Sequence, residues 1–304
     1  MKVALVGAEL EENLGLRYLH SSIEKAGHQA RIFDFHSPMQ LHQIVEKIVN
    51  YGPEVVGLSL VFTGRAREFV TLAQELRRAG FCGHITAGGH FASFHAHELL
   101  RDHSALDSAI HGEGEEAIVA LIGNLAAPAS VLGITYRDGE GRIATTSPRP
   151  NPDDLDSRPF PTRPSSFPAY LGQPIANILS SRGCYANCHF CSIHAWYRQN
   201  PGKQFRQREV GCVATEMAQL YHKREVRIFN FHDDNFFLPE TQHNVERFLS
   251  LQRQLRKERV GRIAIQVKAR PDCVDLRTML VLKNVGLFRV FLGACRDSPS
   301  VLAA

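Results

Sequence analysis

Short apolar runs alternate with amphipathic stretches along the first 126 residues of the chain. The runs are rich in Val, Ile and Phe, and the stretches between them repeat apolar residues at helical spacing, several stopping at a glycine. Strands that alternate with helices in this way predict a doubly wound parallel sheet. The predicted strands are residues 3–6, 30–33, 55–62, 84–87 and 109–110, and the predicted helices are residues 16–26, 41–49, 66–79 and 116–125.

Small and polar residues follow four of the predicted strands, at residues 9–15, 59–63, 88–90 and 112–114. Ligands of doubly wound sheets bind beyond the carboxyl ends of the strands, so a ligand crevice is expected there. Any single glycine in these loops could instead serve only a tight turn. Neither a G-x-G-x-x-G after the first strand nor a Walker A pattern is present, so these two nucleotide fingerprints do not apply.

The pattern changes between residues 127 and 174. A hairpin is predicted from residues 131–136 and 142–146, across a turn of Asp, Gly and Glu. Eight prolines then lie between residues 147 and 174. Proline lacks an amide donor and interrupts helices, so this stretch is expected to be an irregular connector.

The alternation of strands and helices resumes after the prolines. Strands are predicted over residues 175–181, 226–231, 262–267 and 288–292, and helices over residues 215–222, 241–257 and 276–284. This repeated β/α order predicts part of a TIM-like barrel, in which functional groups lie at the C-terminal ends of the strands. The chain is therefore expected to be an α/β protein of three segments: a domain over residues 1–126, a linker over 127–174 and a partial (β/α) barrel over 175–304.

Three of the seven cysteines stand together directly after the first strand of the second half. Cys184, Cys188 and Cys191 form C-x3-C-x2-C, with Phe190 before the last cysteine. Iron–sulfur clusters are usually held by four cysteines, so three thiolates would leave one iron of a 4Fe–4S cluster open. Two alternatives stay open: a zinc site that uses His189 or His194 as a fourth ligand, and a chance grouping of buried cysteines.

The other four cysteines, at positions 82, 212, 273 and 295, are scattered along the chain. An odd total without a secretion signal argues against a disulfide framework, and buried apolar positions are expected for them. The chain has 304 residues and a formal net charge of +4, with no concentrated basic stripe, so no nucleic-acid partner is expected. Without a signal peptide or an 18-residue apolar run, no membrane span is expected and the default location is cytoplasmic.

The first domain resembles the cobalamin-binding domain found in front of many radical S-adenosylmethionine enzymes. The resemblance rests on residues 9–19 (ELEENLGLRYL), 57–60 (GLSL), 88–91 (GGHF) and 107–116 (DSAIHGEGEE). It implies that cobalamin contacts Asn13, Gly15, Ser59, Gly88, Gly89, His90, Gly112, Glu113 and Gly114. The D-x-H-x-x-G motif, which supplies a histidine to cobalt in many cobalamin proteins, is absent, as it is in many cobalamin-dependent radical methylases. A fold that no longer binds the corrinoid is the open alternative.

The cysteine motif resembles that of the radical S-adenosylmethionine family, in which S-adenosylmethionine occupies the open iron. The resemblance implies that S-adenosylmethionine is contacted by Phe190, Asp233, Asp234, Asn235, Lys268 and Arg270. For Asp233, Asp234 and Asn235 the alternative is a helix cap or turn. For Lys268 and Arg270 it is a plain surface cation. One-electron cleavage of S-adenosylmethionine needs an electron donor such as flavodoxin or ferredoxin.

The family's barrel usually has six β/α units, and only four strands are predicted here. Cys295 and Arg296 stand where the resemblance leads one to expect Glu and Ser. A barrel that ended after its fourth strand would expose an unpaired edge. We therefore expect a truncated, split or divergent protein that is poorly stable alone or needs a complementing polypeptide.

The leading hypothesis is a cobalamin-dependent radical enzyme acting on a small-molecule substrate, such as a C-methyltransferase. Two alternatives stay open: a radical enzyme without functional corrinoid, and a non-catalytic cluster-binding subunit of a split enzyme.

Overall fold

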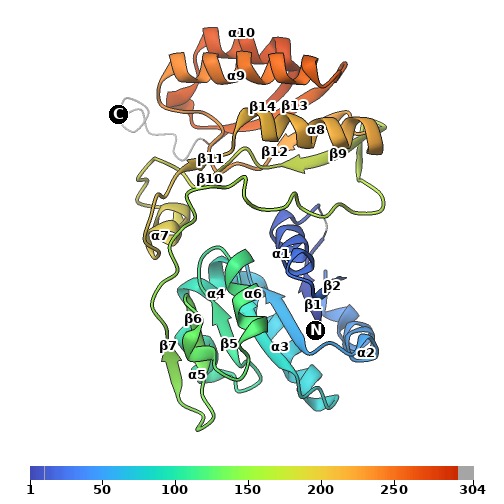
Figure 1. The fold of residues 1–304 in the computed structure, drawn as a ribbon, viewed down its shortest axis with the longest axis vertical. Helices are drawn as coiled ribbons and strands as arrows, with labels where there is room; N and C mark the ends of the chain where they lie inside the picture. Colours follow the sequence, from blue (N-terminus) through green and yellow to red (C-terminus); the bar gives the residue numbers. More distant parts are fainter. Residues whose placement is uncertain (10, 294–304) are drawn as a thin grey trace. The chain divides into compact units, whose positions relative to one another are not determined.

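The computed structural model describes residues 1–9 and 11–293, which form two compact units. The first unit consists of Met1–Asp153, Ser157–Arg163 and Phe190–Lys203. The second unit takes Asp154–Asp156, Pro164–His189 and the chain from Gln204 onwards. Figure 1 shows the elements of both units, most of them with labels. The predicted segment with Cys295 and Arg296 lies outside the described residues.

The first unit is built on a seven-stranded sheet in the order β2-β1-β3-β4-β5-β6-β7. The first five strands pair in parallel, and β6 and β7 are added antiparallel at one edge. The predicted doubly wound sheet is confirmed, and the hairpin that the sequence assigned to the linker extends it. The strands are β1 (Lys2–Gly7), β2 (Gln29–Asp34), β3 (Val55–Ser59), β4 (His84–Gly88), β5 (Ser108–Ile110), β6 (Ile134–Arg137) and β7 (Ile143–Thr145).

The helices of the first unit are α1 (Leu14–Lys25), α2 (Leu41–Tyr51), α3 (Thr63–Arg78), α4 (His90–Phe94), α5 (Ala96–Asp102), α6 (Glu115–Gly123) and α7 (Ser192–Arg198), with short turns η1 (Pro38–Gln40) and η2 (Pro128–Ser130). Alternate residues of each strand point to opposite faces of the sheet, so both faces are apolar, and helices cover each of them. Val3 and Leu5 of β1 belong to one apolar core with α1 and α6, whereas Ala4 and Val6 belong to another with α2, α3 and α5. The short α4, α5 and α7 were not predicted, because five to seven residues are too few to show a helical period.

The second unit contains a five-stranded sheet in the order β14-β13-β12-β9-β8. Its four predicted strands are confirmed as parallel neighbours, and only the short β8 pairs antiparallel. The elements are β8 (Ala169–Tyr170), β9 (Gln173–Ile178), β12 (Ile228–Phe231), β13 (Ala264–Ala269), β14 (Leu287–Leu292), the separate pair β10 (Ser181–Arg182) and β11 (Arg206–Gln207), the helices α8 (Val210–Arg224), α9 (Thr241–Lys257) and α10 (Leu276–Val285), and the turn η3 (Pro271–Cys273).

The two faces of this second sheet differ in chemistry. Phe229 and Phe231 of β12 belong to an apolar core that includes residues of α8, α9 and α10. Asn230, between them, points to the opposite face and takes part in a ladder of amides across three strands. Its Nδ2 donates to Asn177 Oδ1 of β9 at 3.0 Å, and its Oδ1 accepts from Gln266 Nε2 of β13 at 3.1 Å.

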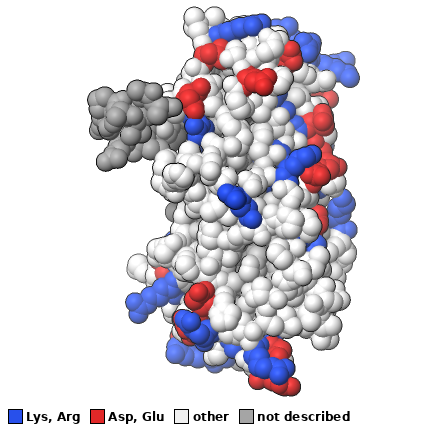
Figure 2. All heavy atoms as spheres, turned by 90° about the vertical axis from the view of Figure 1, so that its left-hand side faces the viewer, with Lys and Arg blue, Asp and Glu red and all other residues white. Residues whose placement is uncertain are grey.

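The proline-rich stretch is irregular, as predicted. Residues 146–168, all of which the structure describes, contain no helix or strand. The predicted domain boundaries at residues 126 and 174 stay a prediction. None of the helices in the described part of the chain has the length and apolar character needed to cross a membrane. On the face shown in Figure 2, Lys and Arg side chains lie interspersed with Asp and Glu.

Candidate functional site

The entrance to the cysteine loop is fixed by a buried carboxylate. Asp233 follows β12 and is fully buried. Its Oδ1 accepts hydrogen bonds from the Ser180 backbone N–H at 3.1 Å, from Ser180 Oγ at 2.8 Å and from Ser181 Oγ at 2.5 Å. Burial raises the pKa of Asp233, although these hydrogen bonds favour its charged form. The carboxylate thus joins the end of β12 to the segment that leads from β9 into the cysteines.

Two arginines, the buried Arg208 and the partly exposed Arg247, also hold this segment. Arg247 of α9 donates from Nη2 to the Ser180 carbonyl at 3.2 Å and from Nη1 to the Arg208 carbonyl at 3.2 Å. Arg208 donates to the Leu179 carbonyl at 2.9 Å and pairs with Glu216 of α8 at 2.5 Å. Hydrogen bonds from charged donors in a buried setting are strong, so the approach to the cysteines is rigidly held.

Gly183 makes the turn that comes directly before Cys184. Its φ of +82° is in the left-handed region, and a Cβ at this position would lie 1.8 Å from the Gln204 carbonyl oxygen. No other residue fits there without moving the backbone. The Gly183 N–H donates to Asp234 Oδ2 at 3.0 Å, so Asp234 holds the turn itself.

Asp234 is an unusual carboxylate. The residue as a whole is exposed, but its carboxyl group lies among protein atoms. This desolvation, together with the smaller effect of the charge of Asp233, raises the pKa of Asp234 to about 6. Lys268 lies close enough for its charge to lower the pKa of Asp234 in part. The neighbouring His232 has a pKa lowered to about 4, because it is buried and faces Lys268. Asp234 therefore titrates near neutral pH, whereas His232 stays uncharged.

Cys184 and Cys188 lie in the second unit and are half-buried. The Cys184 thiol accepts a hydrogen bond from the Ala186 N–H at 3.4 Å, and burial raises its pKa. Cys188 Sγ accepts from Arg270 Nη1 at 2.9 Å. Arg270, which the resemblance assigned to S-adenosylmethionine, is thus directed at a cysteine of the motif.

Asn235 is the other polar residue at this strand end. Asn235 is 1% exposed, and its side chain interacts with the Tyr185 hydroxyl and the Cys273 thiol. Its amide thus contacts one residue of the cysteine loop and one residue of the turn after β13. The carboxylate of Asp233 is engaged by Ser180 and Ser181 and has no exposed surface. Contacts from Asn235 and Asp233 to S-adenosylmethionine stay predictions.

Cys191 and Phe190 belong to the first unit, at the start of α7. Phe190 is 71% exposed. Within residues 1–9 and 11–293, no three His, Cys, Asp or Glu side chains are grouped closely enough to hold a metal ion. The spacing of the three cysteines in the sequence remains the basis of the cluster assignment.

The predicted cobalamin residues lie at the strand ends of the first unit. Ser59 and Gly88 are paired at the ends of β3 and β4. Gly88 has open space where a side chain would stand. Gly89 has a φ of +98°, and a Cβ there would lie 2.9 Å from the Leu60 carbonyl oxygen, so the two strand ends approach closely. The structure brings these three residues together.

His90 follows directly and stacks on Trp196 of α7, with ring centroids 4.5 Å apart and planes at 25°. Burial lowers the pKa of His90, so its ring is neutral. Neither His90 Nε2 nor Trp196 Nε1 has a hydrogen-bond partner among the described residues, and both atoms are buried. Two buried, unpaired nitrogens thus lie at this strand end, next to Gly88 and Gly89.

Asn13 and Gly15 have a structural role at the start of α1. Asn13 Oδ1 accepts from the Leu16 N–H at 3.2 Å, which caps the helix, and Asn13 Nδ2 donates to the Ala8 carbonyl at 3.1 Å. Gly15 lies in the first turn of the helix. These contacts shape the loop after β1, and a cobalamin contact from either residue stays a prediction.

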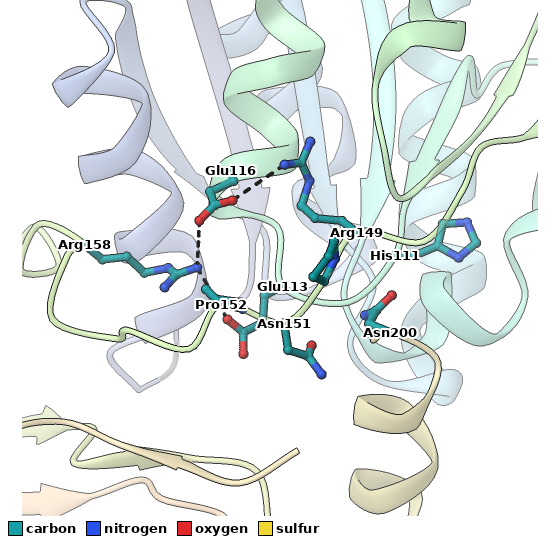
Figure 3. Close-up of a pocket in the computed structure, with 9 residues that line it drawn as sticks. His111, Glu113, Glu116, Arg149, Asn151, Pro152, Arg158 and Asn200 are labelled. Atoms are coloured by element: carbon teal, nitrogen blue, oxygen red, sulfur yellow. Dashed lines mark hydrogen bonds and ion pairs between the residues drawn. The ribbon is translucent and has the colours of Figure 1, made fainter. Parts of the chain in front are cut away.

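The segment Gly112, Glu113 and Gly114 contacts other parts of the first unit. Gly112 has a φ of +66°, and a Cβ there would lie 2.0 Å from Asn200 Nδ2. Glu113 pairs with Arg158 at 3.7 Å, and both side chains are almost fully buried. Glu116 pairs with Arg158 and with Arg149 around a cavity of about 10 Å³ (Figure 3). The segment thus fastens the proline-rich stretch, and its contact with cobalamin stays a prediction.

Comparison with known proteins agrees with this arrangement. Residues 3–122 match the model of the B12 binding domain. The hopanoid C-3 methylase of Methylococcus capsulatus is 30% identical over 299 residues, covering 93% of this chain and 53% of that protein. An uncharacterized methyltransferase of Pyrococcus horikoshii is 25% identical over 296 residues, covering 95% of this chain and 62% of that protein. Residues 3–122 are thus a B12 binding domain, and the chain as a whole is similar to cobalamin-dependent radical S-adenosylmethionine methyltransferases.

Solved structures of this family have the same fold. The methyltransferase TsrM of Kitasatospora setae, with cobalamin and a 4Fe–4S cluster bound, superposes with a TM-score of 0.77 at 19% identity, covering 99% of this chain and 62% of that one. The cobalamin-dependent radical enzyme OxsB gives a TM-score of 0.75 at 20% identity, covering 99% of this chain and 45% of that one. The chain spans about half to two thirds of the length of these relatives.

Several residues of the candidate site were not predicted from the sequence. Ser180, Ser181 and Arg247 hold the cysteine loop, and Asp272 holds Arg270, yet none belongs to a motif. Asp272 had a local signal, because it stands two residues after Arg270 and next to a proline. The partners of Asp233 lie 52 and 53 positions away, and no local pattern indicates such pairs.

Asp233→Ala is expected to lower the free energy of unfolding of the chain by about 2–4 kcal/mol. The change leaves buried donors of Ser180 and Ser181 without an acceptor, which costs about 1–3 kcal/mol for each group. Urea unfolding measures the loss, and trypsin cleavage after Arg182 should become faster. Glu258→Ala, at an exposed position of the same unit, is the control and should change stability by less than about 0.5 kcal/mol. Equal stability of the two variants would contradict the role of Asp233.

Asp234 predicts a dependence of stability on pH. Its pKa in the folded chain, about 6, lies above the ordinary value of 3.8. Between these values the folded chain holds a proton that the unfolded chain has released, so this contribution to stability is lost as pH rises. Asp234→Asn removes the dependence, and its unfolding free energy relative to the parent should be higher at pH 7 than at pH 4. Urea unfolding at both pH values tests this, with Glu258→Gln as the control; equal differences for both variants would refute it.

Proposed function

We propose that the chain is the cofactor-binding part of a cobalamin-dependent radical S-adenosylmethionine C-methyltransferase. In this proposal Cys184, Cys188 and Cys191 bind a 4Fe–4S cluster. The observation that carries the proposal is a C-x3-C-x2-C loop, held at strand ends of a parallel sheet, in a chain whose first 122 residues contain a B12 binding domain. Relatives named as methylases or methyltransferases support the reaction type.

The donor groups of the loop fit an iron–sulfur cluster. Cys184 and Cys188 are half-buried, and the guanidinium of Arg270 donates to Cys188 Sγ at 2.9 Å. Three cysteines leave one iron for S-adenosylmethionine, and Asn235 lies at the strand end next to Asp234. Asp234 offers a carboxylate and Lys268 a cation beside it. Asp233, Ser180 and Ser181 keep the loop in place.

The first unit fits cobalamin in the same way. The open space at Gly88 and the close approach of Gly89 to β3 lie at the strand ends, and the buried, unpaired nitrogens of His90 and Trp196 lie next to them. When bound together, the cluster and S-adenosylmethionine supply one-electron cleavage, and cobalamin supplies a transferable methyl group. The chain's own residues bind these groups, orient them and exclude water.

The substrate is a small molecule in this proposal, and reduced flavodoxin or ferredoxin supplies the electron. Because the chain spans about half the length of the hopanoid methylase, further segments or a complementing polypeptide would contribute substrate contacts. A second candidate is a radical enzyme that does not transfer a methyl group. Relatives named anaerobic magnesium-protoporphyrin IX monomethyl ester cyclase favour it, one from Synechocystis being 27% identical over 232 residues. Release of 5′-deoxyadenosine without methyl transfer would support this second candidate.

Cys188→Ala is expected to lower the iron bound after anaerobic reconstitution by roughly tenfold, because one of three ligands is lost. Iron and sulfide are counted per chain, and 5′-deoxyadenosine is measured after reduction with S-adenosylmethionine present. Cys212→Ala, another half-buried cysteine of the second unit, should keep the parent's iron content. Zinc in place of iron, or equal iron in both variants, would contradict the cluster. A cluster without 5′-deoxyadenosine would favour a non-catalytic binding subunit.

Gly88→Leu is expected to weaken the binding of hydroxocobalamin by roughly tenfold, because the side chain fills the open space at the end of β4. Gly139→Leu is the matched control, since it also enters open space but lies in the β6–β7 turn. Absorption spectra after gel filtration measure the bound corrinoid, and circular dichroism checks that both variants are folded. If the parent binds no hydroxocobalamin, the first unit does not function with this cofactor.

A further inference from the structure

The turn after β13 is joined to the cysteine loop at two points, both within the second unit. Arg270 Nη1 donates to Cys188 Sγ at 2.9 Å, and Cys273 Sγ lies 2.6 Å from the Tyr185 hydroxyl. Cys273 is buried in the apolar core. The turn is therefore anchored in the core through Cys273, and the guanidinium of Arg270 contacts the cysteine loop.

The direction of Arg270 is set by a second residue of the turn. Asp272 accepts from Arg270 Nε at 2.9 Å through Oδ1 and from Nη2 at 2.5 Å through Oδ2. A planar guanidinium bound through Nε and Nη2 presents Nη1 on its remaining side, which is where Cys188 lies. The Cys273 N–H also donates to the Arg270 carbonyl at 3.1 Å, which closes the turn.

We propose that Arg270 is a positioning residue that donates to the Cys188 sulfur and raises the reduction potential of the 4Fe–4S cluster. The inference rests on the proposed function, because it requires a cluster on Cys188. Reduction adds one electron from an external donor to the cluster, so the reduced state has more negative charge on its sulfurs. A cationic donor at one sulfur stabilises that state more than the oxidised state, and hydrogen bonds to sulfur are known to set cluster potentials.

This role differs from the contact with S-adenosylmethionine that the sequence suggested for Arg270. A residue that binds the carboxylate of S-adenosylmethionine changes the affinity for that ligand and leaves the potential of the ligand-free cluster as it was. A residue that donates to Cys188 changes the potential of the ligand-free cluster. Titrations with and without S-adenosylmethionine therefore separate the two roles.

The experiment compares Arg270→Gln and Arg270→Lys with the parent, using the full chain after anaerobic reconstitution. Arg277→Gln is the control, because it removes the same charge from an exposed position at the start of α10. Iron and sulfide are counted first. The reduced cluster is then followed by electron paramagnetic resonance while the potential is lowered with dithionite, first without S-adenosylmethionine and then with it.

At one applied potential, we expect the ratio of reduced to oxidised cluster to fall roughly tenfold in Arg270→Gln, as loss of a charge-assisted hydrogen bond implies. Arg270→Lys keeps the charge and should show a smaller fall, and Arg277→Gln should match the parent. Asp272→Asn, which loosens the guanidinium, should fall between the parent and Arg270→Gln.

Three results would overturn the inference. The first is an unchanged ratio in Arg270→Gln at full iron content. The second is a loss of affinity for S-adenosylmethionine at an unchanged potential, which would return Arg270 to that ligand. The third is a parent chain that assembles no iron–sulfur cluster, and this one also overturns the proposed function. If Arg270→Gln assembles no cluster, the test rests on Arg270→Lys. The inference is refuted if the ratio of reduced to oxidised cluster in Arg270→Lys equals that of the parent and of Arg277→Gln.

Discussion

The second unit depends on one buried carboxylate. Asp233 has no exposed surface, and just after β9 it accepts hydrogen bonds from the Ser180 N–H and from the hydroxyls of Ser180 and Ser181. Everything that follows along the loop is placed by that contact: the left-handed turn at Gly183, the bond from Gly183 to Asp234, and the first cysteine. A carboxylate is suited to this task because it accepts several hydrogen bonds at once. The burial that makes it rigid also raises its pKa.

Charge around the loop is arranged in two layers. The inner layer contains the buried Arg208 and Glu216 and the partly exposed Arg247, and the two arginines bind backbone carbonyls. The outer layer contains Arg270, which donates to Cys188 Sγ, and Lys268, whose charge lowers the pKa of Asp234 in part. The first layer fixes geometry, whereas the second places positive charge beside a sulfur and a carboxyl group. A site that gathers several thiolates needs both, since neighbouring negative charges repel one another.

The sequence correctly predicted long helices with a clear amphipathic repeat. It did not predict which elements pair or which distant side chains contact one another. Helix α9 coincides with the predicted residues 241–257, because seventeen residues show the amphipathic repeat clearly. The β6–β7 hairpin was recognised, but its attachment to the first sheet depends on pairing with β5, which local pattern does not encode. The cysteine motif was found because its chemistry is local. Arg270 was found as a candidate, but its bond to Cys188, 82 positions away, could not be predicted, because only the folded chain brings the two residues together.

The amide ladder of Asn177, Asn230 and Gln266 has a consequence for how the second sheet assembles. Each amide sits opposite the next in strand register, and each is flanked along its strand by apolar residues. A slip of one residue between β12 and either neighbour would turn amides into the apolar core and break the ladder. Polar groups inside a sheet contribute little net stability, but they make mispaired arrangements costly. The ladder therefore favours the native register of these three strands over registers shifted by one residue.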